Sequence, residues 1–141
     1  MSGVFVDTSA LYALFAPRDS KHREAVAILR ELGRARTPLV TTDLCLVEAY
    51  VLVHARTGRA GLLRFRKALS SSAWLEIIPM SPEHQANAWS LLDERTDKDY
   101  SFVDAGSFVV MRILGIERAF TFDDHFSQEG FDVLKARPKA H

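Results

Sequence analysis

Three carboxylates stand alone inside apolar stretches, and they constrain the fold of this chain more than any other feature. Asp7, Glu48 and Asp104 are each the only charged side chain in a run of at least ten residues. A buried carboxylate costs several kcal/mol unless a cation or hydrogen-bond donors compensate it. No Lys or Arg lies within these runs. The fold must therefore bring the three acids to a compensating partner, and one shared divalent cation would serve all of them.

Length and composition are those of one globular domain. The chain has 141 residues, of which 48% are hydrophobic and 26% charged, so a packed core is expected and disorder is not. The net charge is zero, so any basic surface must be local. The single cysteine, Cys45, excludes an internal disulfide. We see no signal peptide and no apolar run of membrane length, which predicts a cytoplasmic protein without membrane association.

Short apolar runs alternate with helical patterns along the chain. Strands are expected at residues 4–6, 39–41, 74–79, 118–122 and 131–134, and helices at 10–15, 19–33, 43–58, 61–69, 81–94 and 101–115. This alternation predicts a single α/β domain over residues 1–135, with a mostly parallel five-stranded sheet flanked by helices on both faces. Residues 136–141 are expected to form a flexible C-terminal tail.

The positions of four acids predict a common site. In such folds the active site lies beyond the carboxyl ends of the strands. Asp7 and Asp123 each directly follow a predicted strand, whereas Glu48 and Asp104 lie near the starts of their helices. These acids are therefore expected to meet in one cleft. Clustered carboxylates repel one another unless they hold a hard cation such as Mg²⁺ or Mn²⁺, which can activate a water for phosphodiester hydrolysis.

Each acid also has an ordinary structural interpretation. Asp7 could cap the following helix, Asp104 could be the acidic partner in a capping box, and Asp123 could be a turn residue. Glu48 could simply be exposed on its helix. The metal-site prediction therefore depends on all four acids occurring together. His125 is interpreted as a capping or packing residue and not as a ligand.

Four segments occur in order across essentially the whole chain: Val6-Asp7-Thr8-Ser9-Ala10-Leu11, the helix with Glu48, Lys98-Asp99-Tyr100-Ser101-Phe102-Val103-Asp104-Ala105 and Thr121-Phe122-Asp123-Asp124-His125-Phe126. Together they resemble the PIN-domain ribonucleases, and more narrowly the VapC-type toxins of bacterial type II toxin–antitoxin systems. One departure from the family pattern is Asp124, an acid where relatives often carry a basic residue. Whether Asp123 or Asp124 is the fourth acid stays open at this point.

The resemblance implies a Mg²⁺-dependent endoribonuclease that acts on single-stranded or looped RNA, with Mn²⁺ able to substitute. It implies that the catalytic and metal-binding acids are Asp7, Glu48, Asp104 and Asp123. Supporting roles would fall to Thr8, Ser9, Asp99 and Asp124. A homodimer and a cognate antitoxin are further implications. The alternative is a catalytically silent PIN-like module that binds RNA or another protein.

One segment of this neutral chain is basic. No acid occurs between Glu48 and Glu76, but five basic residues do: Arg56, Arg59, Arg64, Arg66 and Lys67. These residues could form an ordinary solvated helix face. Alternatively, they could contact RNA and steer its backbone toward the acidic cleft, which repels RNA when it holds no metal. Surplus apolar residues on the early helices also predict a protein partner.

Overall fold

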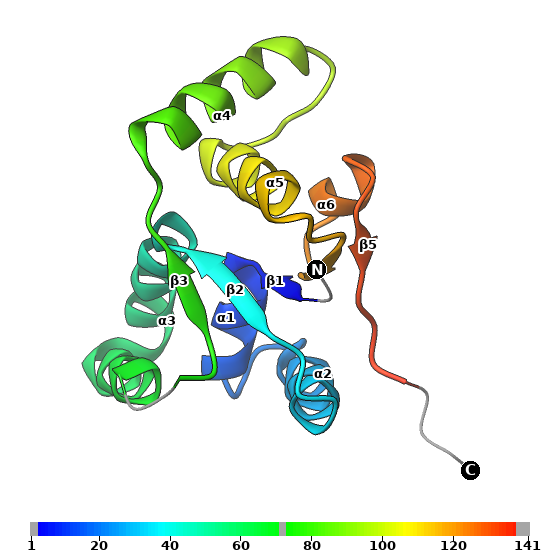
Figure 1. Cartoon of the computed structure of the whole chain (residues 1–141). Helices are drawn as coiled ribbons and strands as arrows, with labels where there is room; N and C mark the ends of the chain where they lie inside the picture. Colours follow the sequence, from blue (N-terminus) through cyan, green and yellow to red (C-terminus); the bar gives the residue numbers. More distant parts are fainter. Residues whose placement is uncertain (1–2, 71–72, 138–141) are drawn as a thin grey trace.

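The fold is built around one sheet. In the computed structural model, which describes residues 3–70 and 73–137, five strands form this sheet: β1 (Val4–Val6), β2 (Leu39–Thr42), β3 (Glu76–Ile78), β4 (Arg118–Phe120) and β5 (Asp132–Val133). Their order is β3-β2-β1-β4-β5 (Figure 1). Every strand pairing is parallel. The predicted five-stranded α/β sheet is therefore confirmed.

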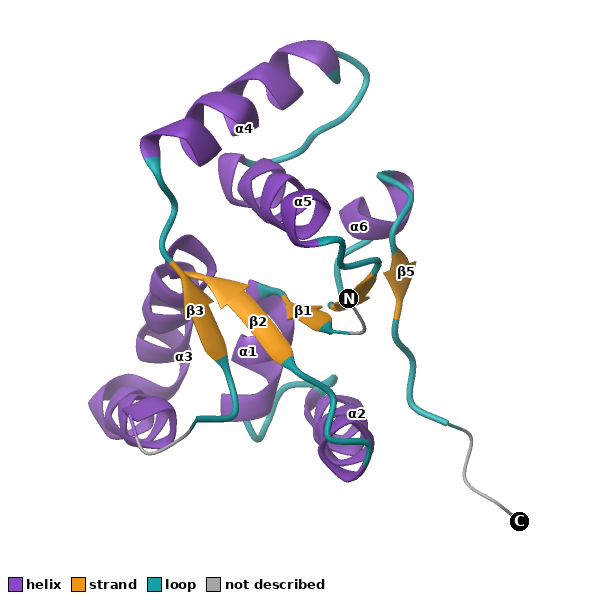
Figure 2. Ribbon diagram, viewed as in Figure 1, coloured by secondary structure: helices purple, strands orange, loops and turns teal. Residues whose placement is uncertain are grey.

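Helices connect the strands and pack on both faces of the sheet (Figure 2). They are α1 (Thr8–Phe15), α2 (His22–Arg34), α3 (Asp43–Ser70), α4 (Pro82–Glu94), α5 (Phe102–Leu114) and α6 (His125–Gln128). Val4 and Val6 of β1 pack into the apolar cluster of α1, α2 and α3, whereas Phe5 packs into that of α4, α5 and α6. Because successive side chains of a strand point to opposite faces, this three-residue strand belongs to both cores.

The start of α5 confirms the predicted capping box. The Ser101 hydroxyl accepts a hydrogen bond from the Asp104 N–H, and the Asp104 carboxylate accepts one from the Ser101 N–H, each at 3.0 Å. The helix ends at Leu114 and is capped by Gly115, whose positive φ of 69° is readily adopted by glycine. The capping box fixes Asp104 in the first turn of α5.

The long helix α3 bends at Gly58. This residue has φ 74° and ψ −172°, which are not helical angles. Two helices were predicted here, at 43–58 and 61–69, and the two halves of α3 do run in different directions (Figure 1). Glycine takes a positive φ without the steric cost that a side chain would add, so it is the residue suited to this bend.

The predicted start of the second helix is wrong. We expected it to run from 19 to 33, but α2 begins at His22. Asp19 forms a turn instead, because its carboxylate accepts a hydrogen bond from the Lys21 N–H at 3.0 Å. Gly33 lies inside the helix, and Arg36, with a positive φ of 53°, follows its end. The remaining element bounds differ from the predicted ones by no more than two residues.

The chain after β5 packs beside α2. Leu134 and Ala136 contact the apolar cluster that includes α2, and the Arg137 N–H donates to the Glu31 carboxylate at 3.4 Å. Residues 138–141, most of the predicted flexible tail, lie outside the described residues, so the boundary of the tail stays a prediction. None of the helices in the described parts of the chain is both long enough and apolar enough to span a membrane.

A buried ion-pair network joins α4, α5 and α6 through Glu129, whose side chain is only 3% exposed. Arg95 donates two hydrogen bonds of 3.0 Å to the two carboxylate oxygens, and the Tyr100 hydroxyl donates a third of 3.0 Å. Arg112 forms an ion pair of 2.7 Å with the same group. Burial alone would raise the Glu129 pKa, but these donors lower it to about 2. The network fixes the loop that leads into α5 and therefore the helix that carries Asp104.

We predict that Glu129→Gln destabilises the protein while keeping its shape. The free energy of unfolding at about pH 7 should fall by about 2 kcal/mol, because charge-assisted hydrogen bonds to a buried carboxylate are lost. Since the Glu129 pKa is lowered, its stabilisation is present above the ordinary glutamate pKa and is lost as pH falls toward 2. Urea denaturation measures both effects. Gln128→Ala, at an exposed neighbour, is the control, and an equal loss in both variants would contradict the role of the network.

Candidate active site

The four predicted acids lie at the carboxyl edge of the sheet. Asp7 directly follows β1, and Asp123 lies in the turn after β4. Glu48 lies in the second turn of α3, which begins directly after β2, and Asp104 lies in the first turn of α5. The negative charge of Asp104 raises the pKa of both Asp7 and Glu48, and that of Asp123 raises the pKa of Glu48. The acids from these separate segments are therefore electrostatically coupled.

Asp7 is the most buried of the four, with 3% of its surface exposed. Its Oδ2 accepts hydrogen bonds from the hydroxyls of Ser9 and Thr121, both at 2.9 Å, and caps α1 through the Ser9 N–H at 3.4 Å. Burial raises the Asp7 pKa to about 6, against the lowering effect of these hydroxyls and with a further rise from Asp104. The ordinary capping interpretation is thus confirmed, but capping does not compensate the buried charge in full.

Glu48 lies at the solvent side of the cluster and is exposed. Partial burial raises its pKa, the nearby Thr8 hydroxyl opposes the rise, and the charges of Asp104 and Asp123 add to it. Thr8 itself is buried and donates to the Cys45 carbonyl at 3.3 Å. Glu48 is therefore the acid of this group that water reaches most easily.

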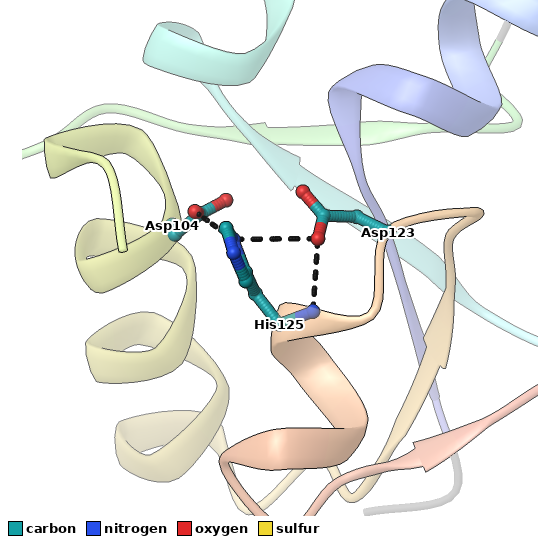
Figure 3. A group of neighbouring side chains, drawn as sticks. All are labelled: Asp104, Asp123 and His125. Carbon is teal, nitrogen blue, oxygen red and sulfur yellow. Dashed lines mark hydrogen bonds and ion pairs between the residues drawn. The ribbon is translucent and has the colours of Figure 1, made fainter. Parts of the chain in front are cut away.

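Asp104 and Asp123 meet across His125, as Figure 3 shows. The His125 Nδ1 atom lies 2.7 Å from Asp104 Oδ2 and 3.3 Å from Asp123 Oδ1. One ligand atom from each of the three residues lies within 4.8 Å of the others, a spacing that a metal ion could bridge. The His125 ring also packs edge-on against Tyr100, with 5.3 Å between the ring centroids. The predicted packing role of His125 is confirmed, but its contacts with Asp104 and Asp123 were not predicted from the sequence.

The position of His125 between two acids raises the pKa of its imidazole. Burial alone would lower the His125 pKa, but the hydrogen bond to Asp104 and the charges of Asp123, Asp104 and Asp99 raise it. Within the described residues, His125 is the only basic side chain that pairs with one of the four acids. Its imidazolium form offsets part of the negative charge of the metal-free cluster.

Thr121 is a second residue whose role sequence analysis missed. Its hydroxyl donates to Asp7 Oδ2 at 2.9 Å and accepts from the Asp123 N–H at 3.0 Å. The Ser9 hydroxyl makes a parallel link, since it donates to Asp7 and accepts from the Phe122 N–H at 2.9 Å. These bonds replace sheet pairing after Phe120, which explains why β4 ends earlier than predicted. The only sequence signal was a hydroxyl two residues from each acid.

The remaining predicted residues lie at the margin of the site. Asp99 is exposed, and its negative charge contributes to the raised pKa of His125. Asp124 is exposed at the start of α6, whereas Asp123 belongs to the group that contacts His125. The structure therefore favours Asp123 over Asp124 as the fourth acid.

The five basic residues of α3 lie on different parts of its surface. Arg56 and Arg64 border one hollow, and Arg66 borders a second, apolar one. Arg59 and Lys67 are exposed and border neither of these hollows. The basic segment is therefore not one continuous face.

The donor set fits a hard divalent cation. Among the described residues, Asp104 uses Oδ2 for its hydrogen bonds and Asp123 uses Oδ1, so the other oxygen of each takes none of them. Carboxylate oxygens are the ligands that Mg²⁺ and Mn²⁺ prefer, and the imidazole nitrogen is acceptable to Mn²⁺. In the part of the chain that the structure describes, no Lys or Arg forms a salt bridge with these acids. A cation would relieve their mutual repulsion.

Comparison with known proteins gives a consistent set of matches. The sequence model of the PIN domain matches residues 4–131. Over 138 residues the chain is 37% identical to a Mycobacterium tuberculosis protein named 23S rRNA-specific endonuclease VapC20, in each of two strains, with 96% of this chain and 99% of the relative covered. The crystal structure of M. tuberculosis VapC20, described as a sarcin–ricin loop cleaving toxin, aligns with a TM-score of 0.84 and 31% identity over 94% of this chain and 99% of the other.

We predict that Mg²⁺ or Mn²⁺ raises the melting temperature by several degrees, because a ligand that binds only the folded state stabilises it. Asp104→Asn and Asp123→Asn should remove most of this rise. Asp124→Asn is the matched control and should keep it, since Asp124 is an exposed neighbour outside the cluster. Thermal melts with EDTA as the reference measure the effect. An equal rise in all three variants would contradict the shared cation.

A second prediction concerns the metal-free protein. Because the Asp7 pKa is raised to about 6, folded Asp7 binds a proton more tightly than unfolded Asp7. Its contribution to stability is therefore present at low pH and is lost as pH rises through about 6. Between about pH 4.5 and pH 7 this loss should amount to about 2 kcal/mol, and Asp7→Asn should lack it. Urea denaturation in EDTA at both pH values tests the difference, and parallel pH profiles of wild type and variant would refute it.

Proposed function

The chain belongs to the PIN-domain family, and from that premise we propose that it is a divalent-metal-dependent endoribonuclease of the VapC type, the toxin of a type II toxin–antitoxin pair. The observation that carries the proposal is the contact of Asp104 and Asp123 with His125 at the carboxyl edge of a parallel sheet. Asp7 and Glu48 lie near enough for the charge of Asp104 to raise their pKa, and no Lys or Arg pairs with any of the four acids among the described residues. Such an arrangement suits cation binding more than stability.

We assign the metal-holding role to Asp7, Asp104 and Asp123, with His125 as an additional nitrogen donor. When bound, Mg²⁺ or Mn²⁺ supplies Lewis-acid polarisation of a phosphate and an acidified water. In this proposal Glu48 would orient the attacking water and accept its proton, since it is the most exposed of the acids and its pKa is raised.

The hydroxyls of Ser9 and Thr121 act in this proposal by holding Asp7 in place. Both donate to Oδ2 of Asp7, and Thr121 also accepts from the Asp123 backbone. Two acids from the ends of β1 and β4 are thereby kept in a fixed relation before any cation binds. Preorganised ligands of this kind need little rearrangement on binding.

We propose 23S rRNA, and within it the sarcin–ricin loop, as the first substrate to test. The support is the likeness to M. tuberculosis VapC20, which carries that specificity in its name and covers nearly all of this chain. The basic residues of α3 support an RNA substrate independently, because they supply local positive charge in a chain with no net charge. We therefore propose a cytoplasmic location, where such a substrate would be found.

Exposed apolar side chains on α3 support the proposed protein partners. Val47, Val51 and Leu63 are 58%, 62% and 45% exposed, and Val51 and Leu63 line the same hollow. Large apolar side chains gathered in this way often mark interfaces. We propose a second copy of the chain and a cognate antitoxin as partners, with this α3 surface as the contact site for one of them. The silent-module alternative gains no support from any observation.

We predict that the protein cleaves an RNA hairpin with the sarcin–ricin loop sequence in Mg²⁺ or Mn²⁺, and that EDTA abolishes cleavage. Asp104→Asn should lower the rate about 100-fold or more, because a ligand of the cation is lost. Asp124→Asn should retain activity. Gel analysis of labelled RNA, with ribosomes as a second substrate, gives the measurement. Cleavage that persists in EDTA would contradict a metal-dependent mechanism. Cation binding without cleavage of any RNA would favour a catalytically silent module.

A further inference from the structure

A hollow bordered by three arginines lies between α1 and the bend of α3. It has a volume of about 570 Å³ and takes Arg18 from the loop after α1, Arg56 from before the bend and Arg64 from after it. Tyr12 and Asp19 also line it. Arg18 is distant in sequence from the basic segment, so sequence analysis did not include it.

Two glycines near the hollow allow the backbone conformation that brings its lining residues together. Gly58 turns the chain with a φ of 74°, and Gly61 then packs against Thr57. A Cβ atom at position 61 would lie 1.7 Å from Thr57 Oγ1, which is far inside contact distance, and 3.6 Å from the Arg64 guanidinium. The residues after the bend can therefore approach those before it only because position 61 has no side chain. The nearness of Arg56 and Arg64 follows from this backbone arrangement.

The charge in the hollow is predominantly positive. Arg56 lies over the Tyr12 ring, with 6.0 Å to its centroid. None of the three arginines forms a salt bridge with any acid in residues 3–70 and 73–137. Asp19 is the one acid among the residues that line the hollow, and its carboxylate accepts from the Lys21 N–H. Guanidinium groups without a carboxylate partner are well suited to phosphate, which they bind through paired hydrogen bonds.

The hollow lies along the two helices that begin at the acid cluster. Tyr12 is one turn after Thr8 on α1, and Arg56 is eight residues after Glu48 on α3. At 1.5 Å per helical residue, the second separation is about 12 Å along the axis. A few nucleotides of extended chain span such a distance.

We propose that this hollow binds a backbone phosphate of the RNA substrate a few nucleotides from the bond that is cut. The inference depends on the proposed ribonuclease function and adds a second binding point to it. The acid cluster repels RNA, so an anchor at a distance from the cluster offsets that repulsion and places the scissile phosphate.

A neighbouring surface argues against a protein partner as the occupant. The other hollow on α3, of about 300 Å³, is lined largely by apolar side chains that include Val51, Leu62 and Leu63. That surface has the chemistry expected for a protein interface. The arginine hollow lacks it and carries instead the unpaired positive charge that a polyanion requires.

The test compares Arg56→Ala and Arg64→Ala with Arg30→Ala, a change of equal charge at an exposed position on α2. With the RNA hairpin as substrate, we expect each hollow variant to raise KM about tenfold while kcat changes little, so that kcat/KM falls about tenfold. Arg30→Ala should have kinetic constants near those of wild type. Arg66→Ala, on the same helix but outside the hollow, should lose less than Arg64→Ala. The rise in melting temperature with Mn²⁺ should be unchanged in all of them.

RNA binding provides a readout that does not need cleavage. In an Asp104→Asn background, fluorescence anisotropy with the same hairpin should show a salt slope smaller by about 0.7 for each phosphate that the variant no longer binds. Equal losses in Arg30→Ala, Arg66→Ala and the hollow variants would reduce the effect to general charge and overturn the proposal. Unchanged RNA binding in both hollow variants would also overturn it. If wild type cleaves no RNA, the proposed function fails, while the binding experiment still decides on the hollow.

Discussion

The uncompensated negative charge at the carboxyl edge of the sheet is the constraint on which the rest of the structure depends. Asp7 and Asp104 are buried, and neither has a Lys or Arg partner among the described residues. Hydroxyls, backbone N–H groups and one imidazole are all that the fold offers them. Such donors orient carboxylates without neutralising them, so the negative charge of the cluster remains and favours the approach of a cation.

Two buried carboxylates in this fold have opposite electrostatic environments. Glu129, only a short distance along the chain from Asp123, is paired with two arginines and a tyrosine hydroxyl, and its pKa is lowered to about 2. Asp7 has no such partners, and its pKa is raised to about 6. One acid is thus fully satisfied and contributes to stability, whereas the other is left poorly compensated. Opposite pKa shifts within one small domain distinguish the structural carboxylate from the one that we propose to hold the cation.

The element order and the acid positions were predictable because they depend on local patterns. The apolar runs, the capping box at Ser101 and the glycine at 115 specify helices and strands through interactions within a few residues. The roles of Thr121 and His125 were not predictable, since each depends on partners brought close by the sheet. Arg18 was missed for the same reason. The wrong start of α2 arose from a local competition, in which Asp19 formed a turn where a helix cap was expected.

The three residues of β1 pack into both apolar clusters of the protein and directly precede Asp7. Phe5 enters one core, Val4 and Val6 enter the other, and Asp7 follows at once. A single inserted residue would exchange the faces of these side chains and carry Asp7 out of alignment with Thr121. An insertion or deletion between Val4 and Asp7 is therefore expected to disrupt both cores and the first acid at once, whereas a longer surface loop would leave them intact.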